Sequence, residues 1–276
     1  MATEATKAIA SACNTFGWNL YKEMRNDADP TENLIFSPYS IYIALQMVYA
    51  GAEGATKKEM QEKMGLSAIS GDTHAFMRQL QDHITPVGSK TFMTANGIFA
   101  RTGKEFLPGF LAFLEDNYGA LPKRLDFWSD PEGSREYIND WVAEQTEQII
   151  KGLLPEGWID HYTAMVLVNT IYFKGRWEQP FKTWDTKKDV FRVDNDNTVT
   201  VDVMNMEEHL LVVEREKYKL LVLKYLRDDH TKGKMRMALI LPNEDVKLET
   251  VENLFLKNGT ELTDARKALR LSLIHI

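Results

Sequence analysis

The sequence predicts an α+β fold, because helical patterns dominate its first half and strand patterns its second. Apolar residues recur mainly at helical spacing up to about residue 154, and short apolar runs replace them after Phe181. Helices and strands do not alternate strictly, which argues against a parallel βαβ sheet. The 276 residues contain no Pro/Gly/Ser-rich linker and no internal repeat. A single domain with a sizeable core is the simpler interpretation.

Helices are expected wherever apolar residues repeat every three to four positions. The first spans about 9–24, and the second, 38–50, is apolar nearly all round and so belongs inside the domain. Ser37 and Pro38 suit the N-cap and first position of that second helix. The remaining expected helices are 56–64, 76–84 with Thr73 as its cap, 106–118, 131–154 and 249–258.

Strands are expected at 91–100 and 163–173, and the second is almost continuously apolar, as in a strand covered on both faces. A turn at 194–197 separates 190–191 from 199–203 and predicts a hairpin. Further strands are expected at 210–213, 220–225 and 235–241.

Composition excludes several classes of partner. Lys and Arg number 33 against 40 Asp and Glu, a net charge of −7 without a clustered basic face, so no nucleic-acid partner is expected. No run of eighteen apolar residues exists, so no membrane span is expected. The single Cys13 cannot form an internal disulfide and is interpreted as a small buried hydrophobe. No cleavable signal peptide is visible, which favours a cytoplasmic location.

Catalytic and metal-binding motifs are absent from the sequence. It contains no Gly-rich phosphate loop, no Gly-x-Ser-x-Gly elbow and no His-Glu-x-x-His pair, and its six histidines are dispersed. The acidic stretch 194–202 lacks the glycine and terminal glutamate of a calcium loop. We therefore expect no enzyme activity, no metal and no cofactor.

Two places are less ordinary. Asn169 interrupts the apolar run 165–173, where a buried amide must find hydrogen-bond partners, and the hydroxyls of Ser37 and Ser40 could supply them. A structural network and a functional one are both open interpretations. Trp177 directly follows this strand and could simply close the end of a sheet.

Four segments, in this order, resemble motifs of the serpin family. They are 33–41 with Ala50-Gly51, 138–142 with Thr146, 167–181, and 224–226 followed by 237–242. One departure is Ile149, where the family usually carries a lysine. The resemblance covers residues 1–270.

This resemblance implies a metastable α+β fold, with helices packed around a large central mixed sheet of five strands and two further sheets. It implies a suicide-substrate inhibitor, whose exposed reactive loop is cleaved by a serine or cysteine protease and then inserts into the central sheet. The alternative is a non-inhibitory member that acts as a storage, carrier or chaperone protein. A monomer is expected. No heparin site is expected, because the helix 76–84 carries Arg78 as its only lysine or arginine.

The resemblance also implies roles for individual residues. The shutter is the region where strands of the central sheet separate to admit the cleaved loop, and the breach is the region where insertion begins. One helix crosses the sheet. One glycosylation sequon would be used if the protein is secreted. The shutter residues are Ser37, Ser40 and Asn169, the breach residue is Trp177, the helix residues are Asn139, Trp141 and Thr146, and the sequon begins at Asn258.

The resemblance leaves the C-terminal part of the family fold unmatched. We interpret 1–270 as a partial serpin domain, incomplete at the C-terminus, without hinge, reactive loop or closing strands. Translation of a common sequencing-library adaptor gives the same six residues that stand at 271–276. We therefore interpret these residues as an artefact, with a genuine strand as the alternative. The chain alone should inhibit no protease and should fold poorly. The family is largely extracellular, so that location competes with the cytoplasm.

Overall fold

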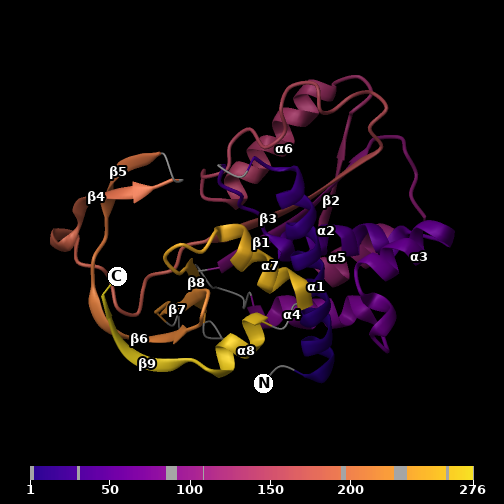
Figure 1. Cartoon of the computed structure of the whole chain (residues 1–276). Helices are drawn as coiled ribbons and strands as arrows, with labels where there is room; N and C mark the ends of the chain where they lie inside the picture. The colour runs from indigo at the N-terminus through magenta and orange to yellow at the C-terminus, as the bar shows by residue number, and fades with distance from the viewer. Residues whose placement is uncertain are drawn as a thin grey trace. The chain divides into compact units, whose positions relative to one another are not determined.

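The computed structural model describes residues 3–29, 32–84, 92–107, 109–193, 197–226, 235–258 and 261–275. Within these residues the chain forms two compact units (Figure 1). The first unit contains 3–17 and 36–174, and the second contains 18–35, 175–226 and 235–275, with the gaps just given.

The first unit contains most of the helices and a mixed three-stranded sheet of order β2-β1-β3. β1 pairs parallel with β2 and antiparallel with β3, so that Gly97 lies opposite both Leu121 and Val168. The elements are α1 (Glu4–Asp27, which continues into the second unit), α2 (Pro38–Gly51), α3 (Gly54–Lys63), η1 (Leu66–Ala68), α4 (Thr73–Ile84), β1 (Phe92–Arg101), α5 (Phe110–Tyr118), β2 (Leu121–Leu125), α6 (Pro131–Gln145) and β3 (Met165–Phe173).

Apolar layers cover both faces of this sheet, because successive strand side chains point to opposite faces. Ile98 joins the core built by α1, α2, α4 and α5, whereas its neighbour Phe99 joins a second core under α6. Helix α6 packs against β1 and β3 (Figure 1). The two-sided cover predicted for β3 is only partly right: Val168 and Thr170 are buried, but the other residues of β3 keep some exposure, because β3 is the edge strand of the described sheet.

The start of α2 follows the sequence prediction closely. Ser37 is extended and its hydroxyl accepts a hydrogen bond from the Ser40 amide at 3.2 Å, while Pro38 occupies the first turn. The predicted cap of α4 is wrong. Thr73 lies inside that helix, and the Asp72 carboxylate accepts from the amides of His74 and Ala75.

The second unit contains a two-stranded sheet, β4-β5, and a four-stranded antiparallel sheet of order β8-β7-β6-β9. The hairpin strands are confirmed, although residues 194–196 of their predicted turn lie outside the described residues. The elements are η2 (Thr183–Asp185), β4 (Lys187–Arg192), β5 (Thr198–Val203), β6 (Glu207–Glu214), β7 (Tyr218–Lys224), β8 (Arg236–Pro242), α7 (Leu248–Asn258), α8 (Glu261–Lys267) and β9 (Arg270–His275).

Helix α7 covers one face of the four-stranded sheet. Phe255 stands at the centre of this core, 5.2 Å from the Tyr218 ring and 6.2 Å from the Trp18 ring. Strand β2 and helix α8 were not predicted, and β9 corresponds to the strand that was given as the alternative for 271–276. β9 pairs along β6, and the interpretation of 271–276 as an adaptor translation stays a prediction.

No helix in the described parts of the chain is long and apolar enough to cross a membrane. The same residues contain no group of three or more His, Cys, Asp or Glu side chains that could hold a metal ion.

Gly17 marks a close approach of α1 and α2. A Cβ atom at this position would lie 2.7 Å from Pro38 Cβ, well inside contact distance. Gly17→Ala is therefore expected to lower the free energy of unfolding by about 1–3 kcal/mol, although alanine favours the helix. Urea titration measures this change. Ser11→Ala, an exposed position of the same helix, is the control, and equal stability of the two variants would contradict the close approach.

Candidate functional site

Asn169 finds the partners that its position in an apolar strand demands. It lies in β3 directly opposite Asn96 of β1, and its Nδ2 donates to Asn96 Oδ1 at 2.7 Å. Its own Oδ1 accepts a hydrogen bond from the Ser40 hydroxyl of α2. Asn169 therefore connects two strands of the sheet with the helix that lies beneath them.

Asn96 extends this connection to α5 and α4. Its Nδ2 donates to the Tyr118 carbonyl at 2.6 Å and to Gln81 Oε1 at 3.4 Å. The residue is 7% exposed, so its amide is satisfied almost wholly by protein. Asn96 was not among the residues predicted from the sequence. The available signal was a second amide in a predicted strand, which can stand opposite Asn169 only when the strands pair in this register.

The network formed by Ser40, Asn96, Asn169 and the Tyr118 carbonyl, here called the amide network, occupies one layer between sheet and helices. It follows the same face of β1 as the buried Ile98, two residues along the strand. Ser37 contributes indirectly, since its hydroxyl caps α2 through the Ser40 amide. The sequence-predicted residues Ser37, Ser40 and Asn169 thus meet in one place.

Tyr118 links the amide network to a half-buried histidine. Its hydroxyl bonds His74 Nδ1, and the His74 ring also stacks on Tyr49 of α2 at 5.5 Å. Burial lowers the pKa of the His74 imidazole below its usual 6.5. The carboxylate of Asp72 acts in the opposite direction, and Lys57 adds to the lowering.

The three predicted residues of α6 fasten the helix in different ways. Trp141 packs edge-on against Phe99 of β1 at 5.5 Å between ring centres. Asn139 binds the returning chain through both backbone groups of Leu154, at 2.8 and 3.0 Å. Thr146 is almost fully buried, and its hydroxyl donates to the Val142 carbonyl at 2.8 Å.

The expected extent of this helix was wrong. Instead of continuing to 154, α6 ends at Gln145, and Glu147 and Gln148 adopt positive φ values of 51° and 62°. Two consecutive left-handed residues turn the chain back, and the Thr146 hydroxyl accepts the Ile150 amide at 3.2 Å. Ile149, where the family usually carries lysine, is exposed.

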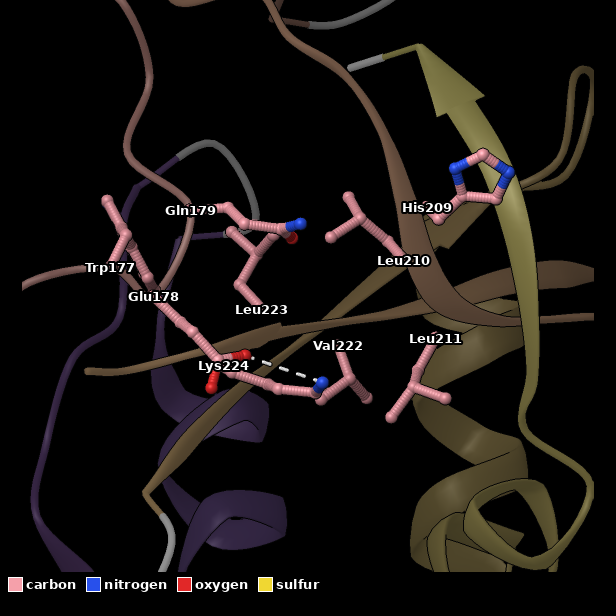
Figure 2. A pocket seen from close by; sticks show the side chains of 9 residues that line it. All are labelled: Trp177, Glu178, Gln179, His209, Leu210, Leu211, Val222, Leu223 and Lys224. Carbon is pink, nitrogen blue, oxygen red and sulfur yellow. Dashed lines mark ion pairs between the residues drawn. The ribbon is translucent and has the colours of Figure 1, made fainter. Parts of the chain in front are cut away.

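Trp177 belongs to the second unit, where it closes the end of a sheet. Its ring stacks on Tyr225 at 4.4 Å, and the Glu178 amide donates to the Lys224 carbonyl at 2.8 Å. Figure 2 shows Glu178 and Lys224 facing each other, as an ion pair of 3.4 Å. The space enclosed there is about 10 Å³, roughly the minimum for one water molecule. The side chain of Asn258 lies outside the described residues.

Removing either amide should leave the other one buried with an unsatisfied hydrogen-bonding group. Asn169→Ala and Asn96→Ala are each expected to lower the free energy of unfolding by about 1–3 kcal/mol. Because both share one hydrogen bond, the double variant should lose less than the sum of the two. Denaturant titration tests this, with exposed Asn14→Ala as the control. Additive losses would show that the two amides do not interact.

The half-buried His74 gives a pH dependence of defined sign. In the unfolded chain the imidazole gains its proton near pH 6.5, whereas the folded chain resists protonation to a lower pH. The stabilisation is complete above pH 6.5 and is lost as the pH falls through the lowered pKa. The free energy of unfolding, measured from pH 7.5 to 5, should therefore fall as the pH is lowered. His74→Phe should make this dependence on pH shallower. The exposed His209→Phe is the control and should leave the pH dependence of the free energy of unfolding unchanged. A pH dependence that is unchanged in His74→Phe, or that is flattened in His209→Phe instead, would refute the assignment to His74.

Comparison with known proteins agrees with the motifs. A model of the serpin (serine protease inhibitor) family matches residues 11–273. Serpin B6 of Macaca fascicularis is 35% identical over 253 residues, 88% of this chain and 64% of that protein. Leukocyte elastase inhibitor A of Mus musculus is 35% identical over 86% of this chain and 61% of its own length. The chain thus spans less than two thirds of the curated relatives that it matches. The comparisons give no support to the extracellular location implied by the resemblance.

Solved structures match the fold. Ovalbumin from emu (Dromaius novaehollandiae) aligns with a TM-score of 0.88 and 29% identity, over 98% of this chain and 72% of that chain. The native stressed conformation of a serpin from Arabidopsis aligns with a TM-score of 0.82 and 27% identity, over 96% and 68% of the two chains. The central sheet holds three strands among the described residues, against five implied for the family. On its motifs, its fold and these similarities, the chain belongs to the serpin family of protease inhibitors and not to a family of enzymes.

Proposed function

We propose that the protein from which this chain derives inhibits serine proteases as a suicide substrate. The single observation that carries the proposal is the amide network, which connects α2 to β1 and β3 by side-chain hydrogen bonds. Hydrogen bonds between side chains can break and re-form without chemical change, as a sheet that opens and closes requires. The names of relatives such as leukocyte elastase inhibitor A support a protease as the partner.

In this proposal the site residues regulate a conformational change and perform no covalent step. The shutter consists of Ser37, Ser40 and Asn169, to which we add Asn96. Its hydrogen bonds would hold β1, β3 and α2 together before cleavage. Trp177 would mark the breach, where its stack on Tyr225 fixes the chain beyond β3. Asn139, Trp141 and Thr146 would hold α6 across the sheet while strands separate.

The non-inhibitory alternative is favoured by one observation. The reactive-loop-cleaved human thyroxine binding globulin aligns with a TM-score of 0.88 and 25% identity, and its name describes a binding protein. Both functions use the same fold, so they differ in whether the cleaved loop inserts.

The decisive experiment uses the full-length protein translated from its complete transcript. Incubation with elastase-like, trypsin-like and chymotrypsin-like proteases should give, with at least one of them, a covalent complex that survives a denaturing gel. The same protease with its active-site serine blocked should give none. Cleavage without a complex, and without any rise in the melting temperature of the cleaved protein, would contradict inhibition and support the storage, carrier or chaperone alternative.

A further inference from the structure

The imidazole of His74 lies where α4 packs against α2 and α5, and Tyr118 alone separates it from the amide network. The imidazole stacks on Tyr49 at 5.5 Å and meets Phe113 and Tyr118 edge-on, at 5.1 and 5.9 Å between ring centres. Its Nδ1 lies 2.5 Å from the Tyr118 hydroxyl. Aromatic rings therefore surround much of this half-buried side chain, and a positive charge on it would be poorly solvated.

Two charged groups act on the imidazole from neighbouring segments. The Asp72 carboxylate, which accepts hydrogen bonds from the amides of His74 and Ala75, favours a proton on the ring. The Lys57 ammonium of α3 opposes it, and also lies over the Tyr49 ring, 5.7 Å from its centre. A protonated His74 would therefore place a second cation against an aromatic ring that already holds one. Burial is the largest of these effects, and it keeps the pKa of the imidazole below 6.5.

Tyr118 connects this imidazole to Asn96 through two of its own groups. Its hydroxyl bonds His74, and its backbone carbonyl accepts from Asn96 Nδ2 at 2.6 Å. Gly119 takes a left-handed φ of 61° and ends α5 there, so the Tyr118 carbonyl has no partner within the helix. Burial raises the pKa of the Tyr118 phenol, which therefore stays neutral in acid.

Protonation changes the hydrogen bond that His74 can make with Tyr118. A neutral imidazole accepts the hydroxyl proton at Nδ1, whereas an imidazolium carries a proton on both nitrogens and can only donate. The hydroxyl must then turn its own proton toward another acceptor. Among the described residues the Tyr118 hydroxyl has no other hydrogen-bond partner, and Tyr118 is only 4% exposed to solvent. The protonated ring thus leaves a buried donor unsatisfied unless Tyr118 moves.

We propose that His74 is an acid-sensitive switch for the amide network, because its protonation displaces Tyr118 and so releases Asn96. With His74 neutral, the carbonyl at the end of α5 satisfies Asn96, which in turn accepts from Asn169. With His74 protonated, Asn96 loses that carbonyl, and the connection between β1 and β3 weakens around it. The consequence for inhibition, that acid eases separation of the strands, rests on the proposed function. The coupling of His74 to Asn96 does not rest on it and is measured on the chain itself.

Native-state hydrogen exchange at pH 7.5 and at pH 5, corrected for the intrinsic effect of pH on exchange, tests the switch. Protection of the β1 and β3 amides around Asn96 and Asn169 should fall about tenfold more than that of the β6 and β7 amides. The reason is that the open arrangement gains a proton near pH 6.5, whereas the closed arrangement resists it. His74→Phe and His74→Gln should both remove this difference, and glutamine keeps an acceptor for the Tyr118 hydroxyl. The exposed His209→Phe is the matched control and should retain the difference.

The reciprocal effect supplies a second measurement. If protonation of His74 releases Asn96, removing the Asn96 amide must make that protonation easier. The pKa of His74, followed by NMR, should therefore rise toward 6.5 in Asn96→Ala and stay unchanged in the exposed Asn14→Ala. In a Tyr118→Phe background the effect of Asn96→Ala should disappear, because the hydroxyl that transmits it is gone.

Three results would overturn the proposal. They are a loss of protection at pH 5 that persists in His74→Phe and His74→Gln, a loss equally large in β6 and β7, and a pKa of His74 that Asn96→Ala leaves unchanged.

Discussion

An asparagine amide carries two donors and a strong acceptor, and burying it without partners costs about 1–3 kcal/mol. Asn96 and Asn169 stand opposite each other in neighbouring strands, so each can supply much of what the other needs. What remains is supplied by Ser40 of α2 and by the carbonyl that ends α5. All four groups are satisfied together only in one register of β1 against β3 and one placement of two helices. A slip of a single residue would turn one amide toward the opposite face of the sheet.

The same constraint explains why polar side chains suit this part of the fold. Apolar side chains at these two positions could remove the hydrogen-bond requirement, and with it the preference for one register. The network instead links the sheet to α2, while α6 covers the other face through Trp141 and Phe99. The hydrogen bonds of the network are satisfied in one arrangement of β1, β3 and α2.

Much of the fold follows from periodicity and capping. Ser37 and Pro38 started α2 as expected, and Asn169 was identified because an amide is anomalous in an apolar run. Asn96 escaped notice because its environment depends on pairing with a strand some seventy residues away, which a local pattern does not contain.

Other features could not be predicted either, because they depend on contacts that a local sequence pattern does not contain. Helix α6 stops at Gln145 without glycine or proline, and two non-glycine residues take left-handed conformations that tertiary hydrogen bonds to Thr146 and Asn139 support. Strand β2 contains a proline and two basic residues, so its pattern is not that of a strand, and pairing along β1 decides its structure.

The central claim is that the paired amides hold β1 and β3 in one arrangement. Native-state hydrogen exchange on the unmodified chain and on Asn169→Ala tests it most directly. The account predicts a loss of protection confined to the amides of β1 and β3 around Asn96 and Asn169, with the amides of β6 and β7 in the second unit unchanged. Equal loss in both units, or undiminished protection in β1 and β3, would contradict it.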